Sequence, residues 1–297
     1  MLNYTALLNA KSRGTAFLVL GDPVSHSRSP GLQNAAFEAA GLKKSYARFH
    51  IKVEDLPEFA AFARENLRGV NLTVPHKHAI IPLCDEVDPI AELCGSVNTL
   101  DIRDGKLYGY STDGPGLEYA LKREFDFDIP GKNILFLGAG GACRATAFHL
   151  AAKGAKFITI ANRTKEKAIE LAEMVTANSN CNANGISIAD EESMKLALCR
   201  ADVVIQATSC GLKDDDPSPF DTNWITSDCH FDLFDTIYKD TAIQKACRAK
   251  GLRTAGGKFM LIGQGAASFR IWTGIEPDIQ AMERGFEEAI SQEDTVC

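Results

Sequence analysis

The chain has 297 residues, of which 45% are hydrophobic and 24% are charged, the balance of an ordinary globular protein. A single domain rarely reaches this length, so we expect two domains, each able to bury its own core. The formal net charge of −7 excludes the basic surface that nucleic acid or an anionic membrane requires. An anionic ligand would therefore need its own local group of cations.

The chain carries no sign of export or membrane insertion. Residues 1–11 lack the basic start and apolar core of a signal peptide, and no apolar run approaches the roughly 18 to 20 residues of a membrane span. The nine cysteines are odd in number and scattered, with no CxxC pair and no His/Cys cluster at metal-ligand spacing. We therefore expect a cytoplasmic protein with reduced thiols, no metal, and a small molecule as its ligand.

Short β-rich runs alternate with helical stretches in the first part of the chain. The predicted strands are residues 16–20, 46–51 and 69–73, and the predicted helices are residues 30–40 and 56–65. This alternation predicts βαβ units and a mostly parallel sheet.

A second alternating series begins after the hinge-like Pro130-Gly131 pair. Its predicted strands are residues 133–137, 156–160, 202–206 and 230–233, and its predicted helices are residues 142–153 and 240–250, the latter closed by Gly251. The acidic, proline-containing residues 213–219 predict a surface loop, and residues 278–290 predict a last helix. The fold class is thus α/β, with two sheets.

A glycine-rich turn, GAGGA at residues 138–142, directly follows the predicted strand 133–137. Glycines allow a tight turn and let backbone N–H groups approach a pyrophosphate at the positive end of the next helix. The third position of a strict G-x-G-x-x-G frame holds Cys143, which we interpret as a packing residue rather than an activated thiol. The flanking strand and helix favour a dinucleotide site over a plain strand–helix connection.

A cation stands where an NAD site would usually place an acidic residue after its second strand. The sequence there is Asn162-Arg163-Thr164, with Lys167 one helical turn later. A guanidinium offers paired donors and a charge that offsets a 2′-phosphate. Although Arg163 by itself could be a solvated residue at a helix start, its position after the glycine turn predicts NADP.

Four clusters of small polar residues lie where predicted strands give way to loops or helices: SRSP (27–30), NLTVPHK (71–77), SVNT (96–99) and STDG (111–114). Their hydroxyl and amide groups could hydrogen-bond a polyhydroxylated ring, or serve only as caps and turns. Lys77 and Asp113 are the candidate acid–base pair, because hydride removal from a carbinol requires the hydroxyl proton to leave. An exposed lysine and an ordinary Asp-Gly turn are the alternatives for these two residues.

Taken in order, these motifs resemble the shikimate dehydrogenase family over nearly the whole chain, from Gly21 to Gly274. The resemblance also includes NRT at residues 162–164, ATSCG at 207–211, and GKFML…QG…SF…WTG at 257–274. It implies reversible, NADP-dependent reduction of 3-dehydroshikimate to shikimate, in the route to chorismate and the aromatic amino acids.

The resemblance also implies a substrate-binding domain and a cofactor-binding domain. Residues 1–112 and 262–297 should form the shikimate-binding domain, and residues 113–261 a Rossmann-type NADP domain, with the ligands in a cleft between them. The implied site residues are, for catalysis, Lys77 and Asp113; for the substrate, Ser27, Ser29, Asn71, Thr73, Asn98, Gln264 and Tyr238; and for the cofactor, Gly138, Gly140, Gly141, Ala142, Asn162, Arg163, Thr164, Lys167, Thr208, Ser209, Gly257 and Met260.

Several positions depart from the family pattern. Gln206 stands where Asn commonly precedes ATS, Ser111 precedes TDG, Phe259 replaces a common glycine, and the segment around Tyr238 lacks the usual proline. These departures concern mainly the cofactor-side loops and put the role of Tyr238 in doubt.

Other interpretations of the same pattern remain open. A quinate/shikimate dehydrogenase using NAD is disfavoured by Arg163 and by the paired serines. An aminoshikimate-type relative is not excluded by side-chain identity. A ligand sensor without catalysis would be free to lose Lys77 and Asp113, and both are present. The chain could act as a monomer or a homodimer.

Overall fold

The structure is a computed structural model that describes residues 15–294. The chain forms two compact units, one from residues 1–112 together with 261–297 and the other from residues 113–260. The division predicted from the sequence places the second crossing one residue later, at 261/262. The expectation that residues 1–11 are not a signal peptide concerns residues outside the described part of the chain.

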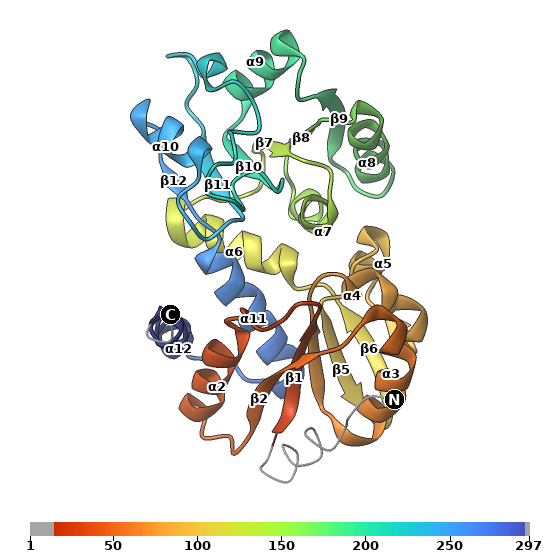
Figure 1. Ribbon diagram of the computed structural model, residues 1–297. Helices are drawn as coiled ribbons and strands as arrows, with labels where there is room; N and C mark the ends of the chain where they lie inside the picture. The colour runs from red at the N-terminus through yellow and green to blue at the C-terminus, as the bar shows by residue number, and fades with distance from the viewer. Residues whose placement is uncertain (1–14, 295–297) are drawn as a thin grey trace. The chain divides into compact units, whose positions relative to one another are not determined.

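The first unit is an α/β unit (Figure 1). Its elements are β1 (Thr15–Gly21), α2 (Ser29–Ala39), β2 (Ser45–His50), η1 (Val53–Asp55), α3 (Leu56–Asn66), β3 (Gly69–Leu72), α4 (His76–Ala79), η2 (Ile81–Leu83), β4 (Glu86–Val87), α5 (Pro89–Cys94), β5 (Thr99–Arg103), β6 (Lys106–Tyr110), α11 (Lys258–Thr273, which begins in the second unit) and α12 (Ile279–Asp294).

The second unit repeats the alternation of strands and helices (Figure 1). Its elements are α6 (Asp113–Phe125), β7 (Asn133–Leu137), α7 (Gly141–Ala152), β8 (Phe157–Asn162), α8 (Lys165–Ala177), β9 (Asn182–Ser187), α9 (Glu191–Arg200), β10 (Val203–Gln206), η3 (Thr222–Trp224), β11 (Asp232–Asp235), α10 (Ala242–Ala249) and β12 (Thr254–Ala255).

The sheet of the first unit is mixed, with the order β2-β1-β3-β5-β6-β4. Strands β1, β2 and β3 run parallel, as predicted, but β5 runs antiparallel to both β3 and β6. A two-residue turn at Asp104-Gly105 joins β5 to β6, and both of its residues have positive φ, 51° and 73°. Asp-Gly is the preferred pair for such a hairpin, so the sequence held a signal that the βαβ interpretation overlooked.

Strand β1 shows why this sheet has a layer of helices on each face. Leu18 and Leu20 belong to a core with residues of α3, α4 and α5. Phe17, in contrast, packs against Phe37 of α2 and Trp272 of α11, with tilted rings and centroid distances of 4.8 and 5.0 Å. Successive side chains of a strand point to opposite faces. The alternating apolar residues of β1 therefore bind both helical layers to the sheet.

The sheet of the second unit is entirely parallel, with the order β12-β11-β10-β7-β8-β9. The chain runs outward from β7 through β8 to β9, and then returns to β10 and runs outward in the other direction. This is the doubly wound, Rossmann-type arrangement. The predicted fold class, α/β with a Rossmann-type second domain, is confirmed.

Most predicted elements are present, with ends shifted by one or two residues. Strand β11 lies two residues later than the predicted strand 230–233, and helix α12 ends four residues later than the predicted helix 278–290. Strand β9 and helices α8 and α9 had not been singled out. The polar sequence of β9, NANGIS, has few of the β-branched and aromatic residues that predict a strand.

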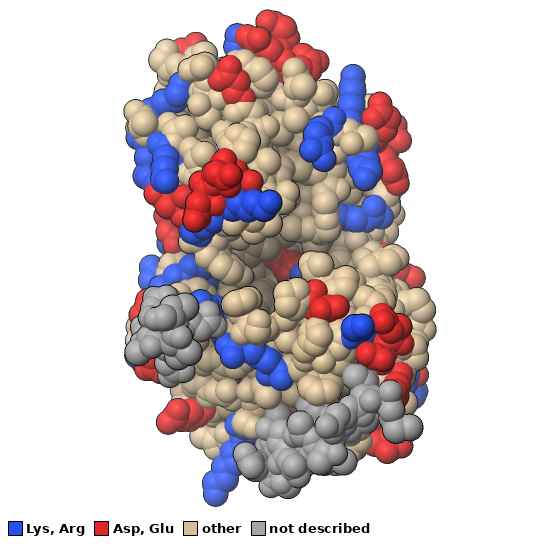
Figure 2. All heavy atoms as spheres, in the orientation of Figure 1, with Lys and Arg blue, Asp and Glu red and all other residues tan. Residues whose placement is uncertain are grey.

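No helix in the described part of the chain is long and apolar enough to cross a membrane. Within residues 15–294, no group of three or more His, Cys, Asp or Glu side chains is arranged to hold a metal ion. Figure 2 shows acidic and basic side chains interspersed over the visible faces of both units.

Helices α2 and α12 approach each other most closely at two glycines. A Cβ atom on Gly285 would overlap the backbone oxygen of Gly31, and a Cβ on Gly31 would overlap the backbone oxygen of Gly285. Because backbone atoms cannot swing aside as a side chain can, both positions require glycine.

We expect Gly285→Ala to lower the free energy of unfolding by about 1 to 3 kcal/mol, the cost of overpacking a close contact. Alanine's better helix propensity, up to about 1 kcal/mol, offsets only part of this cost. Chemical denaturation measures the difference. The control is Glu288→Ala, an exposed position on the same helix, which should stay within about 0.5 kcal/mol of the parent. Equal stability of the parent and Gly285→Ala would contradict the close approach.

Candidate functional site

The register of β3 turns Asn71 away from the apolar core of its own strand. Val70 and Leu72 belong to the core beneath α3, so the alternation of the strand places Asn71 on the opposite face, toward α11. Asn71 is only 5% exposed. A buried amide must find hydrogen-bond partners, because an unsatisfied one costs about 1 to 3 kcal/mol.

The partners of Asn71 come from several elements. Its Nδ2 lies 3.1 Å from the carbonyl oxygen of Asn98 and 3.0 Å from both Thr99 Oγ1 and Ser268 Oγ, and its Oδ1 accepts a 2.7 Å hydrogen bond from the hydroxyl of Tyr46. These contacts join β2, β3, β5 and α11. The amide thus holds together four elements that are distant in sequence.

Asn98 extends this arrangement to Thr112. Its Oδ1 accepts hydrogen bonds from the backbone N–H and the hydroxyl of Thr112, at 2.8 and 3.1 Å. Thr112 Oγ1 lies 3.4 Å from Gln264 Oε1 and 3.3 Å from Ser268 Oγ. We call this set the buried polar cluster: Tyr46, Asn71, Asn98, Thr99, Thr112, Gln264 and Ser268.

Tyr46 also connects the cluster to the serine motif. Its hydroxyl forms a hydrogen bond with Ser29 at the start of α2, and complete burial raises its pKa well above the ordinary value. The phenol therefore stays neutral and keeps its proton for Asn71. Ser27 lies beside this point, since its Oγ accepts a 3.3 Å hydrogen bond from the backbone N–H of Ser29.

Lys77 lies on the short helix α4 that follows β3. Its backbone oxygen accepts a 2.9 Å hydrogen bond from Val97 N–H, which fixes α4 next to the segment that carries Asn98. The neighbouring His76 is buried, and burial lowers its pKa. Thr73 lies between β3 and α4, and its backbone N–H donates a 2.8 Å hydrogen bond to the backbone oxygen of Leu20.

Asp113 is the first residue of the second unit and opens helix α6. It is 8% exposed and directly follows Thr112, whose backbone N–H is held by Asn98. Asp113 is therefore the residue next in sequence to a member of the buried polar cluster.

The sheet of the second unit has its topological switch point between β7 and β10, which pair in parallel although β8 and β9 intervene in sequence. Ligands of doubly wound sheets bind outside the carboxyl ends of the strands at such a point. Gly138 follows β7 there with φ of 103°, and a Cβ on it would come within 3.0 Å of Ala207 O and Thr208 Cγ2. Glycine permits both the turn and the close approach.

The N-terminus of α7 is open at the same edge. Gly140, Gly141 and Ala142 are exposed, and added Cβ atoms at the two glycines would meet nothing within 4 Å. Exposed N–H groups at a helix start form an anion site. Cys143 is completely buried and burial raises its pKa, which confirms the interpretation of this thiol as a packing residue.

Asn162 connects this turn with the cation-bearing loop. Its Oδ1 accepts a 3.3 Å hydrogen bond from Ala139 N–H, and its Nδ2 donates one of 2.8 Å to the backbone oxygen of Thr164. Arg163, Thr164 and Lys167 are exposed. A pyrophosphate on the glycine turn would therefore have a cationic loop on the neighbouring strand.

Gln206 shapes the loop after β10. Its side chain is fully buried, its Oε1 accepts a 2.7 Å hydrogen bond from Thr208 N–H, and its Nε2 donates one of 2.8 Å to Cys210 O. Gln206, which replaces the family's usual asparagine, thus has a structural role. It fixes the turn that carries Thr208 and Ser209.

Asp235 shapes the loop after β11 in the same way. Burial raises the pKa of its carboxyl group, and its oxygens accept hydrogen bonds from Ile237 N–H and from Thr241 Oγ1 at 3.0 and 2.6 Å. Tyr238 lies in this loop and is 58% exposed. Gly257 packs against the same loop, where a Cβ would overlap Thr236 O, and Met260 follows in the first turn of α11.

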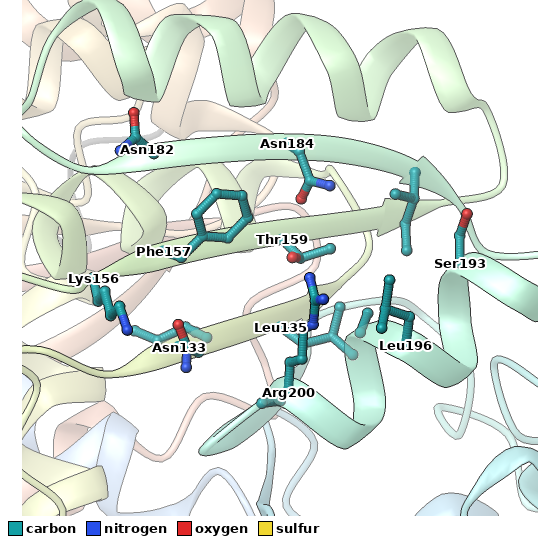
Figure 3. A pocket seen from close by; sticks show the side chains of 14 residues that line it. Asn133, Leu135, Lys156, Phe157, Thr159, Asn182, Asn184, Ser193, Leu196 and Arg200 are labelled. Atoms are coloured by element: carbon teal, nitrogen blue, oxygen red, sulfur yellow. The ribbon is translucent and has the colours of Figure 1, made fainter.

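A groove of about 720 Å³ lies elsewhere on the second sheet (Figure 3). Its lining includes Asn133, Lys156 and Asn182, at or next to the amino ends of β7, β8 and β9, together with side chains of α9 such as Arg200. Its lining includes no residue of the glycine turn or of the cation-bearing loop. The groove therefore does not coincide with the predicted cofactor residues.

Comparison with known proteins agrees with this geometry. Residues 19–100 match the shikimate dehydrogenase substrate-binding domain, 120–212 match shikimate/quinate 5-dehydrogenase, and 260–284 match the shikimate 5′-dehydrogenase C-terminal domain. The shikimate dehydrogenase (NADP(+)) of Moorella thermoacetica is 38% identical over 288 residues, 96% of each chain. The chain belongs to the shikimate dehydrogenase family.

Solved structures of the shikimate dehydrogenase fold are also similar. The shikimate 5-dehydrogenase of Thermus thermophilus, in complex with NADP(H) and shikimate, is 36% identical, with a TM-score of 0.81 over 93% of this chain and 99% of that one. A quinate dehydrogenase of Corynebacterium glutamicum in complex with NAD is 27% identical, with a TM-score of 0.79 over 93% and 99%.

The structure brings together several of the residues singled out from the sequence, and it adds others. Asn71, Asn98 and Gln264 belong to the buried polar cluster, and Ser29 lies at its edge. Tyr238 lies in the second unit. Thr99, Thr112 and Ser268 were not named individually, although each belongs to a quoted family motif. Tyr46 had no such signal, because an aromatic residue inside a strand predicts only packing.

We expect Tyr46→Phe to lower the free energy of unfolding by about 1 to 3 kcal/mol, because Asn71 Oδ1 loses its buried donor. Denaturant unfolding monitored by circular dichroism measures this change. Tyr110→Phe is the matched control, since among the described residues that hydroxyl has a long, exposed 3.4 Å contact with Arg103. Similar effects of the two substitutions would show that the Tyr46 hydroxyl is not part of a satisfied buried cluster.

Proposed function

We propose that this member of the shikimate dehydrogenase family is an NADP-dependent oxidoreductase that reversibly reduces 3-dehydroshikimate to shikimate. The observation that carries the proposal is the 38% identity, over 96% of each chain, to a relative named shikimate dehydrogenase (NADP(+)). Lys77, Asp113 and the polar motifs of the family pattern are all present in this sequence.

The first unit is the proposed substrate unit. Ser27 and Ser29 would hold the substrate carboxylate, and Asn71, Thr73, Asn98 and Gln264 would surround the ring hydroxyls. Hydroxyl and amide groups both donate and accept hydrogen bonds, as a polyhydroxylated ring requires. The hydrogen bonds within the buried polar cluster orient these groups before substrate arrives, which lowers the entropic cost of binding. Tyr238 is the proposed additional carboxylate contact.

The second unit is the proposed NADP unit, and its residues fit the cofactor. Gly138, Gly140, Gly141 and Ala142 would hold the pyrophosphate at the start of α7. Asn162, Arg163, Thr164 and Lys167 would hold the 2′-phosphate. Thr208, Ser209, Gly257 and Met260 would lie on the nicotinamide side. The open space above the two exposed glycines and the exposed guanidinium support this assignment.

Lys77 and Asp113 are the proposed acid–base pair. The reduced nicotinamide, when bound, supplies the hydride to the ketone carbon. Lys77 Nζ gives its proton to the ketone oxygen as negative charge develops there, and takes it back in the oxidative direction. Asp113 is the proposed partner that shares the proton with Lys77.

We expect Lys77→Ala to lower kcat on the order of a hundredfold or more, because general acid–base groups supply about 10² to 10⁴. The dissociation constant of NADP should change little. Steady-state absorbance of the reduced nicotinamide measures kcat, and fluorescence titration measures cofactor binding. Lys44→Ala, an exposed lysine of the same unit, is the control. Near-normal kcat in Lys77→Ala would refute the assignment.

We expect Arg163→Ala to weaken NADP binding by about 1.5 to 3 kcal/mol, the scale of a charged hydrogen bond, and to leave NAD binding almost unchanged. The 2′-phosphate is the group that distinguishes the two cofactors. Calorimetric titration with each cofactor measures the losses, with Arg200→Ala, exposed on α9, as the control. Equal losses for both cofactors would place Arg163 away from the 2′-phosphate.

A quinate dehydrogenase using NAD is the second candidate, favoured by the similarity to the C. glutamicum protein. The cation at Arg163 and the paired Ser27 and Ser29 weigh against it. Turnover assays with shikimate and quinate, each with NADP and NAD, separate the two activities. Absence of turnover in all four pairs would instead favour a ligand sensor.

A further inference from the structure

Two cysteines that are 30 residues apart meet within the second unit. Cys199 lies in the last turn of α9, and Cys229 lies between η3 and β11. Their sulfur atoms are 3.4 Å apart, and Thr226 Oγ1 lies 3.9 and 3.8 Å from the two sulfurs. The contact follows from the fold, since α9 leads into β10, which pairs in parallel with β11.

We propose that Cys199 and Cys229 form an oxidisable thiol pair, which closes to a disulfide within one chain when the protein meets a hydroperoxide.

The two thiols differ in their access to solvent, and this assigns their order of reaction. Cys199 is exposed and lines a hollow of about 550 Å³ together with Asp202, His230 and Arg253. Cys229 is only 4% exposed. A small peroxide therefore reaches Cys199 first, and Cys229 is positioned to react with the oxidised sulfur.

The chemistry balances as a two-electron oxidation. The Cys199 thiolate attacks one peroxide oxygen, the O–O bond breaks, and the sulfur becomes a sulfenic acid while the other oxygen leaves as water or alcohol. The sulfur of Cys229 then attacks the Cys199 sulfur, the S–O bond breaks, and the hydroxyl leaves as water with the Cys229 proton. Two thiols are oxidised, and one peroxide is reduced.

Both cysteines are free thiols in the structure. Burial, followed by the hydrogen bond with Cys229, raises the pKa of Cys199, so little thiolate is present at neutral pH. Reaction consequently needs an excess of oxidant. A disulfide has a sulfur–sulfur bond of about 2.05 Å, so the sulfurs must approach by about 1.4 Å, the difference from 3.4 Å.

The position of Cys199 and Cys229 relative to the sheet predicts the effect of disulfide formation. Cys199 and Cys229 precede the amino ends of β10 and β11, whereas Thr208 and Tyr238 follow the carboxyl ends of the same strands. The bond would join α9 to the segment before β11 without passing through the loops of the proposed cofactor site. Closure should therefore raise thermal stability and leave turnover unchanged.

The experiment treats the full chain with a modest excess of hydrogen peroxide, blocks the remaining thiols with N-ethylmaleimide, and digests with trypsin without reductant. The sequence is favourable, because cleavage after Lys195, Arg200, Lys213 and Lys239 places each cysteine in its own peptide, residues 196–200 and 214–239. We expect one cross-linked pair of these peptides, a loss of two hydrogens from the chain, and reversal by dithiothreitol.

A melting curve supplies the second readout. The closed loop spans about 30 residues, so Tm should rise by about 5 °C or more in the oxidised protein. Cys199→Ser, at the exposed position, should abolish both the cross-link and the shift. Cys84→Ser, a half-buried cysteine of the first unit, should retain both.

Three results would overturn the proposal. They are a cross-link between other cysteines or between two chains, persistent oxygen addition at Cys199 without a cross-link, and an oxidised protein whose Tm equals that of the reduced one. These readouts do not depend on turnover, so the proposal stands apart from the enzymatic assignment.

Discussion

A parallel sheet brings the carboxyl ends of its strands to one edge, and the proposed cofactor site depends on this constraint. In the second unit the loops after β7, β8, β10 and β11 emerge at the same edge. The hydrogen bonds of Asn162, Gln206 and Asp235 then fix the shape of three of these loops. Strand direction thus determines which residues meet, and buried polar side chains determine how they are presented.

The first unit uses the other property of a strand, its alternation between two faces. Leu18, Val70 and Leu72 lie in the core beneath α3, and this orientation directs Asn71 toward α11. The amide can be buried there only because Tyr46, Thr99 and Ser268 supply partners. Removing one partner would leave a buried group unsatisfied, whereas removing an exposed ion pair of the same unit, such as Arg270–Glu276, would cost little.

Much of the fold could be predicted from local patterns. Short β-rich runs located β1, β3 and β7, and the glycine turn after β7 predicted a dinucleotide site at the start of α7. The predictions failed where the signal was weak or misread. Strand β9 consists mostly of polar and small residues, and the β5–β6 hairpin was missed although its Asp-Gly turn is typical of one. Strand β9 is stabilised by its pairing with β8 rather than by its own propensity.

By itself the sequence determined the fold class, the position of the glycine turn, the cation of Arg163 and the motifs that mark the shikimate dehydrogenase family, because each of these is written in consecutive residues or in their periodicity. Tertiary structure alone decided that Tyr46 completes the environment of Asn71 and that Cys199 meets Cys229. Such contacts join residues that are 25 to 30 positions apart or belong to different elements, and no local pattern records a distance that only folding creates.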